Sequence, residues 1–248
     1  PEMNPEWPQT GGAADHAMQH LALAGVPKRA WQTSIGTGSS RDRRVLTQPI
    51  VADGRVFTMD SEGQVSAFEA RSGRRLWREG VLPESAERDA IGGGLAFEDG
   101  MLFVTTGAAQ VLALNPENGK VLWRQAVTAP LRSGPTVAHG RVFAVSVDNQ
   151  LHALDTRDGS KLWAYAGITE IASLLGGSSP AVEGGVVVAP FTSGELVALR
   201  IENGRQLWQD TLIAVRRVDA VSGLADIRAL PVMDRGRIYA ISHSGRMA

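Results

Sequence analysis

The sequence predicts an all-β chain of repeated four-stranded antiparallel sheets, arranged as the blades of a β-propeller. Three observations lead to this prediction. One segment recurs at constant length, it keeps the same residues at the same offsets, and turn signals divide it, together with the short run before it, into four short strands. Each copy runs from a turn glycine to a tryptophan 23 positions later, and repeat periods of about 40 to 50 residues are typical of propellers and solenoids. The copies are residues 54–77, 100–123, 140–163 and 185–208.

The tryptophan of each copy has a glycine four positions before it and an alanine ten positions before it. A tryptophan buries roughly 150 to 250 Å², so its ring needs small residues nearby, and residues that recur in phase are usually structural. We interpret these positions as packing contacts between adjacent blades; binding of a sugar or cofactor by the tryptophans is the alternative. The positions are Trp77, Trp123, Trp163 and Trp208, Ala67, Ala113, Ala153 and Ala198, and Gly73, Gly119, Gly159 and Gly204.

Turn residues define the strands inside a copy. In the first copy Asp53-Gly54 is a tight hairpin signal between two β-rich runs, and Gly63 and Gly73 mark the next two turns. Gly63 has equivalents nine positions after the other opening glycines, and most of them are Gly or Asn, which adopt positive φ readily. These equivalents are Ala109, Asn149, Gly194 and Gly245.

Residues 1–30 precede the repeats and are predicted to be an N-terminal extension, with one or two helical turns over 15–23. Residues 31–36 contain Trp31 but no strands of their own before it. We therefore expect them to complete the last blade of a closed propeller, which would remove a sheet edge; an edge strand on the first blade is the alternative. The propeller is predicted over 31–248, with blades at 46–80, 93–126, 133–166 and 178–211 and part of a fifth at 229–248.

Composition narrows the class of protein. The chain has 248 residues, a net charge of −1 and no cysteine. The charge argues against nucleic-acid binding, and the missing cysteines exclude disulfides, thiolate metal sites and cysteine nucleophiles. The sequence has no apolar run long enough to span a bilayer and no phosphate-loop or hydrolase motif. No secretion signal stands at Pro1, so we expect any such signal to have been removed or to lie upstream. We assign no catalytic, cofactor-binding or metal-binding residue. Because the fifth copy is incomplete, we expect the intact protein to be longer.

The connectors between a tryptophan and the next copy vary, unlike the copies themselves. Residues 165–179 carry one charged side chain among many apolar ones, and residues 211–230 mix apolar residues with arginine and aspartate. Exposed apolar residues bordered by charges are typical of protein interfaces. We therefore expect these two connectors to bind a protein partner; the alternative is that their apolar residues pack back onto the blades.

The repeats resemble those of pyrroloquinoline-quinone (PQQ)-type propellers. One example is Val-Leu-Ala-Leu-Asn115-Pro-Glu-Asn-Gly-Lys-Val-Leu-Trp123. One class with this repeat is the quinone-dependent dehydrogenases, which use a calcium-bound cofactor, an aspartate base and often adjacent cysteines. This chain is much shorter and lacks cysteine, and the cofactor ligands have no clear counterparts here. A fragment of such a PQQ- and calcium-dependent dehydrogenase is the alternative interpretation.

A second class with this repeat is the BamB-type outer-membrane assembly factors. The segment Asn4-Pro-Glu-Trp-Pro-Gln9-Thr-Gly-Gly12 resembles the alphaproteobacterial branch of that family. The resemblance implies an eight-bladed, non-enzymatic periplasmic scaffold without a cofactor, anchored to the outer membrane by a lipidated residue upstream of Pro1. It implies docking onto a periplasmic domain of the insertase BamA, with unfolded outer-membrane proteins as a further ligand class.

The same resemblance implies which residues contact the insertase. In the family these contacts come from a Leu-Ser-Leu-Arg segment and an Asp-x-Asp segment, which correspond here to residues 172–175 and 226–228. Leu174 and Asp226 match the family pattern, whereas Leu175 replaces an arginine and Arg228 replaces an aspartate. The partner-binding residues implied are Ser173, Leu174, Leu175, Asp226 and Arg228.

Overall fold

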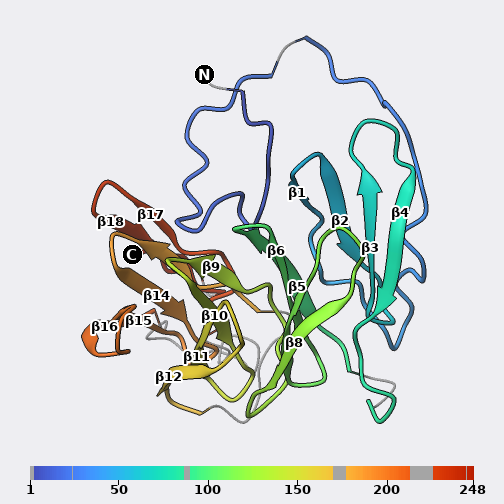
Figure 1. Cartoon of the computed structure of the whole chain (residues 1–248). Helices are drawn as coiled ribbons and strands as arrows, with labels where there is room; N and C mark the ends of the chain where they lie inside the picture. Colours follow the sequence, from blue (N-terminus) through green and yellow to red (C-terminus); the bar gives the residue numbers. More distant parts are fainter. Residues whose placement is uncertain (1–2, 24, 87–89, 170–176, 213–225, 244) are drawn as a thin grey trace.

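The protein is all-β in the computed structural model, which describes residues 3–23, 25–86, 90–169, 177–212, 226–243 and 245–248. Every regular element among these residues is a β-strand (Figure 1). The strands form four four-stranded antiparallel sheets and one two-stranded sheet. The predicted fold class, a propeller of four-stranded antiparallel blades, is confirmed.

The strands fall inside the blade ranges expected from the repeat. Blade 1 comprises β1 (Ile50–Ala52), β2 (Arg55–Met59), β3 (Gln64–Glu69) and β4 (Arg75–Gly80). Blade 2 comprises β5 (Gly93–Glu98), β6 (Met101–Thr106), β7 (Gln110–Leu114) and β8 (Val121–Ala126). Blade 3 comprises β9 (Thr136–Ala138), β10 (Arg141–Val145), β11 (Gln150–Asp155) and β12 (Lys161–Ala166). Blade 4 comprises β13 (Ala181–Glu183), β14 (Val186–Pro190), β15 (Glu195–Arg200) and β16 (Gln206–Thr211). The fifth sheet pairs β17 (Val232–Asp234) with β18 (Arg237–Tyr239).

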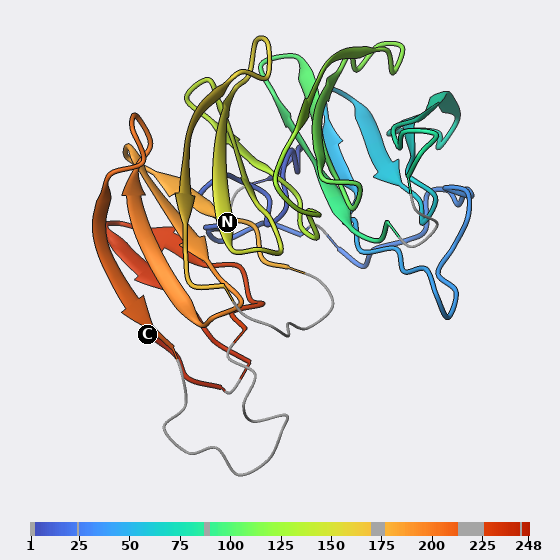
Figure 2. The ribbon, with the colours of Figure 1, turned by 90° about the horizontal axis from the view of Figure 1, so that it is seen from below.

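Strand order in each complete blade follows chain order, so the chain crosses a blade from one edge to the other and then enters the next blade. Figure 2 shows the blades side by side in sequence order, from β1–β4 to β17–β18. The first strands of consecutive blades contact one another, whereas the fourth strands are the most exposed. The first strands are therefore the inner strands, which lie nearest the axis of the propeller.

The middle strands supply most of the core because neighbouring blades cover both of their faces. Phe57 of β2 and Val65 of β3 are fully buried, and they share a cluster with Leu95 and Leu102 of blade 2. In β7 the whole run Val-Leu-Ala-Leu is buried. This two-sided burial explains why the middle strands are almost continuously apolar rather than alternating.

Three of the repeat tryptophans join one blade to the next. Trp77 lies opposite Ala67 of its own blade, and its indole nitrogen donates to the Pro116 carbonyl at 2.7 Å. Its ring covers Gly119 of blade 2, where an added Cβ would lie 2.6 Å from the ring. The glycine that receives each tryptophan therefore belongs to the following blade. The same contacts are made by Trp123 with Ala113, Gly159 and the Thr156 carbonyl, and by Trp163 with Ala153, Gly204 and the Ile201 carbonyl.

The first and last tryptophans of the series differ. Trp31 covers Gly73 of blade 1 and donates to the Ala70 carbonyl at 2.9 Å, which is the contact that an outer strand would make. Residues 31–36 form no strand here, and their role in closing a last blade stays a prediction. Trp208 lies opposite Ala198 but is 38% exposed.

The N-terminal extension is not helical, and the predicted helical turns over 15–23 are wrong. His16 and Gln19 have positive φ, which a right-handed helix does not allow. The reason is tertiary contact: the extension binds the inner strands of the blades, and these contacts determine its conformation. In Figure 1 this blue segment reaches the sheets between β17 and β1.

Candidate partner-binding face

The connectors leave the blades at the same end as the β2–β3, β6–β7, β10–β11 and β14–β15 turns, and we call this end the connector face. Each connector starts with a backbone hydrogen bond to such a turn. The Val81 amide donates to Gly63, and the Val127 amide donates to Ala109, both at 3.0 Å. Gly167 bonds to Asn149 and Leu212 to Gly194 in the same way, at 2.8 Å each. The turn residues all have positive φ, including Ala109 at 56°, so the repeat fixes where each connector begins.

The ends of the connectors are tied together by hydroxyl groups. The Ser133 hydroxyl donates to the Ser178 carbonyl at 3.2 Å, and the Ser178 hydroxyl donates to the Ala229 carbonyl at 2.9 Å. These three residues occupy one repeat position, two residues before Pro135, Pro180 and Pro231. The ends of these connectors are therefore held to one another. The serines at this repeat position in two blades, Ser133 and Ser178, are the sequence signal that could have indicated it.

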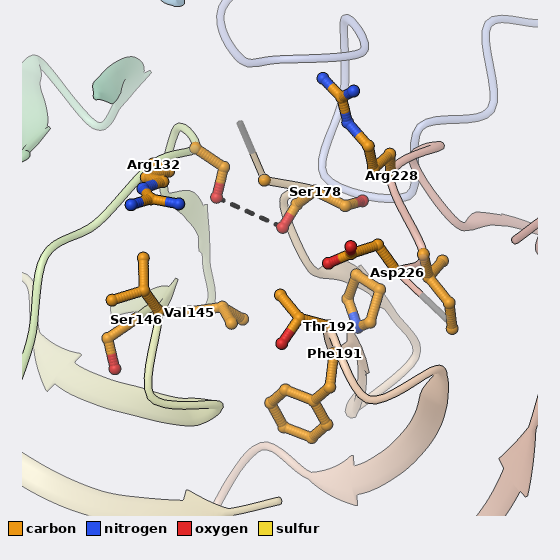
Figure 3. Close-up of a pocket in the computed structure, with 13 residues that line it drawn as sticks. Arg132, Val145, Ser146, Ser178, Phe191, Thr192, Asp226 and Arg228 are labelled. Atoms are coloured by element: carbon orange, nitrogen blue, oxygen red, sulfur yellow. Dashed lines mark hydrogen bonds between the residues drawn. The ribbon is translucent and has the colours of Figure 1, made fainter. Parts of the chain in front are cut away.

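Three connector ends meet in a small pocket between blades 3, 4 and 5 (Figure 3). Its volume is about 30 Å³, which is room for about one water molecule. A site of this size does not hold a quinone or another organic cofactor, whose pockets are roughly ten or more times larger. The side chains around it include Arg132, Ser133, Ser178, Phe191, Thr192, Asp226 and Arg228.

The structure separates the two predicted partner-binding residues of the last connector. Asp226 is 2% exposed, and its backbone carbonyl accepts from the His243 amide at 2.9 Å. Arg228 is exposed, and Figure 3 shows its side chain directed away from Asp226. Asp226 is therefore placed to hold the connector, whereas the Arg228 side chain is accessible at the surface. Ser173, Leu174 and Leu175 lie outside the residues that the structure describes.

Arg132 is a candidate that the sequence interpretation missed. It belongs to the connector between blades 2 and 3, and it lines the same pocket as Arg228. Neither arginine has an ion-pair partner among the described residues. With the buried Asp226, they give the described lining of this pocket two positive charges and one negative charge. No sequence signal linked the two arginines because they are nearly one hundred positions apart.

The start of the connector after β12 is fixed by two buried side chains. The Ile168 amide donates to the Glu195 carboxylate at 2.7 Å, and the Ile168 carbonyl accepts from the Asn149 side chain at 2.5 Å. Glu195 is 3% exposed and also accepts from Ser193 and Gln209. A buried carboxylate normally needs such donors because it has lost its hydration. Ile168 itself is 60% exposed, so an apolar side chain is held at the surface.

Glu195 also affects its surroundings. Burial, followed by the negative charge of Glu195, raises the pKa of Tyr165 above its usual value. The Tyr165 ring stacks on Phe191 with centroids 6.2 Å apart. The other three blades have glutamine at the repeat position of Glu195, namely Gln64, Gln110 and Gln150. This departure from the repeat is the signal that could have identified the residue.

One serine, histidine and aspartate lie together but not as a catalytic triad. The imidazole Nε2 of His152 is 3.0 Å from the Ser146 hydroxyl, and Asp148 contacts that same hydroxyl. In a triad the carboxylate instead binds the other imidazole nitrogen and orients it. Ser146 is 2% exposed, and burial lowers the pKa of His152. We interpret this group as a polar network that closes the β10–β11 turn.

No group of three or more histidine, cysteine or acidic side chains among the described residues is arranged to hold a metal ion. Nor does that part of the chain contain a helix with the length and apolarity needed to cross a membrane.

The four-stranded blades and their repeat place this chain in the class of PQQ-like β-propellers. Its connectors form loops at one end of the propeller. The sequence matches the profile of the family described as outer membrane protein assembly factor BamB over residues 28–88 and 61–248. The chain belongs to this family.

Curated members of the family are similar along most of the chain. BamB of Vibrio cholerae is 34% identical over 222 residues, which is 90% of this chain and 57% of that protein. BamB of Yersinia pestis is 30% identical over 226 residues, with 89% and 57% covered. BamB of Escherichia coli is 29% identical over 262 residues, with 90% and 57% covered. The chain spans a little more than half the length of these relatives.

Solved structures share the fold. BamB from Moraxella catarrhalis superposes with a TM-score of 0.71 at 20% identity, covering 86% of this chain and 63% of that chain. A europium-containing methanol dehydrogenase has a TM-score of 0.71 at 14% identity, covering 98% and 57%. At such low identity the likeness shows the fold alone, and it does not distinguish a scaffold from an enzyme.

Proposed function

We propose that this chain is part of a non-enzymatic scaffold for outer-membrane protein assembly, which binds a protein partner through the connector face. The partner is the periplasmic domain of BamA, with unfolded outer-membrane proteins as a second ligand class. The protein works at the periplasmic face of the outer membrane, to which an upstream lipid anchor ties it. Membership of the BamB family supports a role in outer-membrane protein assembly. The structure of the connector face supports that face as the place where the partner binds.

The observation that carries the proposal is the rigid support beneath variable connectors. Hydroxyl and carboxylate groups fix the connector ends at Ser178 and Ile168, while Arg132 and Arg228 line the pocket between them. Binding loops held on a rigid scaffold lose little conformational entropy on association. Two arginines without acidic partners in the described part of the chain suit a partner with acidic side chains.

The test is to reverse the charge of both arginines. The double variant Arg132→Glu and Arg228→Glu should weaken binding of the purified BamA periplasmic domain at least tenfold in isothermal titration calorimetry, because each pair of opposite charges becomes a pair of like charges. The control is Arg205→Glu, since Arg205 is an exposed arginine in the β15–β16 turn at the opposite end. Unchanged binding by the double variant, or equal loss in the control, would overturn the proposed face.

A second variant tests the connector that lies outside the described residues. Leu174→Asp should also weaken binding, because it replaces an apolar contact by a charge that must be desolvated. The dehydrogenase alternative is tested separately by adding PQQ with calcium and recording the absorbance of bound quinone. We expect no bound quinone; a stoichiometric signal would favour the enzyme interpretation.

A further inference from the structure

The N-terminal extension binds one backbone amide in each of the five blades. All five amides occupy the same repeat position, two residues before the hairpin turn that follows each inner strand. The inner strands have no neighbouring strand on the side facing the propeller axis. The amides belong to Val51, Phe97, Val137, Val182 and Met233.

The first three blades are contacted by three successive residues. Trp7 and Val51 exchange two backbone hydrogen bonds, of 2.6 and 2.8 Å, as paired strands do. The Phe97 amide then donates to the Pro8 carbonyl at 2.8 Å.

In blade 3 the side chain of Gln9 takes the place of a backbone. Its Oε1 accepts from the Val137 amide and its Nε2 donates to the Val137 carbonyl, both at 2.8 Å. Gln9 is 3% exposed, so its two hydrogen bonds are shielded from water.

The extension turns before it reaches the last two blades. Gly11 and Gly12 both have positive φ, and the Gly12 amide bonds back to the Gln9 carbonyl at 2.9 Å. A Cβ on Gly11 would lie 2.7 Å from the His16 ring, so the turn is tightly packed. Beyond it, the Val182 amide donates to Ala14 at 2.7 Å and the Met233 amide donates to Asp15 at 2.8 Å.

An unpaired strand edge is a ready site for another extended segment, and addition of a peptide to such an edge is a common mode of recognition. We propose that the series of equivalent inner-strand amides is a binding site for one polypeptide segment, and that residues 7–15, extended over Trp7–Gln9 and turning at Gly11 and Gly12, occupy it as an intramolecular ligand. While it is bound, the segment keeps these five amides from pairing with other chains, including unfolded ones. This inference concerns the inner strands along the propeller axis and does not depend on the proposed function.

The test uses the whole chain with a specific protease site inserted after Val26, which is 85% exposed. Cutting after folding leaves the segment held by non-covalent contacts alone. A fluorescent synthetic peptide of residues 3–20 should then exchange into the cut protein but not into the uncut one. The same peptide with Gln9→Ala should bind roughly tenfold more weakly, because two buried hydrogen bonds are lost. The control peptide carries Gln19→Ala, since Gln19 is exposed, and should bind within about twofold of the parent.

Amide hydrogen exchange provides a second measurement on the same protein. After the cut segment has been washed away, the amides of Val51, Phe97, Val137, Val182 and Met233 should exchange much faster, while amides of the middle strands keep their protection. Two results would overturn the inference: equal binding of the Gln9→Ala and parent peptides, or five amides that stay protected without the segment.

Discussion

The two ends of the propeller differ in what the repeat specifies. At the end opposite the connector face, turns of constant length place a glycine under the tryptophan of the preceding blade. Along the axis, the N-terminal segment binds equivalent amides in all five blades. At the connector face the repeat fixes the first and last residues of each connector but not what lies between. The comparison teaches that regular positions hold the blades together, whereas the connectors are free to vary, which is why we propose them as the place of partner binding. We therefore expect large stability effects at the first end and small ones at the second.

The largest effect is expected for Trp123→Ala. The substitution removes a ring that fills the contact between blades 2 and 3 and should lower the free energy of unfolding by about 3 to 5 kcal/mol. Trp208→Ala is the matched comparison, because the same repeat position is 38% exposed there; its effect should be clearly smaller. Urea denaturation followed by circular dichroism measures both. Equal losses would mean that the tryptophans do not stabilise the protein through contacts between blades.

A smaller effect is expected for Gly159→Ala. A Cβ at this position would lie 2.5 Å from the Trp123 ring, and the residue has a φ of 73°. Gly100 also has a φ of 73°, but nothing lies within 4 Å of its added Cβ, so Gly100→Ala measures the conformational penalty alone. We expect Gly159→Ala to be the more destabilising by roughly 1 to 3 kcal/mol. If both variants melt alike, the ring does not need this glycine.

Much of this architecture could be predicted from the sequence, because each blade has the same packing and turn requirements and therefore similar residues at equivalent positions. The constant spacing from Gly54 to Trp77 predicts three strands, the apolar run before Asp53-Gly54 predicts the fourth, and the turn positions at Gly63 and Asn149 have the positive φ expected. The N-terminal extension could not be predicted in this way, since His16 and Gln9 are positioned by contacts with strands more than one hundred residues away. Local sequence describes such a segment as irregular or helical and gives no sign of its partners.

For the candidate site, the sequence could indicate which segments to consider but not how their residues are arranged. The unusual composition of residues 211–230 indicated a distinct connector, and the family resemblance pointed to Asp226 and Arg228. It could not show that Asp226 is 2% exposed while Arg228 is on the surface, because burial depends on how three connectors meet. Arg132 was missed for the same reason, since its proximity to Arg228 is a property of the fold.

The smallest effect that we expect is a loss of stability on acidification, caused by His16. Its Nδ1 hydrogen-bonds to the Pro231 carbonyl at 2.7 Å, and its Nε2 is buried without a partner among the described residues. Burial lowers the pKa of His16 below the usual histidine value of 6.5, although the Pro231 carbonyl and the charge of Asp15 oppose this shift. The folded protein therefore binds the proton less readily than the unfolded chain does.

The sign of the effect follows from this difference. Above about pH 6.5 the imidazole is neutral in both states and its contribution is intact; as the pH falls further, the unfolded state takes up the proton first and stability declines. His16→Asn keeps a donor for Pro231 and should flatten this decline in urea titrations between about pH 7 and 5. His152 has a pKa lowered by burial as well, so His152→Gln is the control that separates the two histidines. If stability declines with falling pH as steeply in His16→Asn as in the parent protein, the His16 imidazole is not the source of the pH dependence.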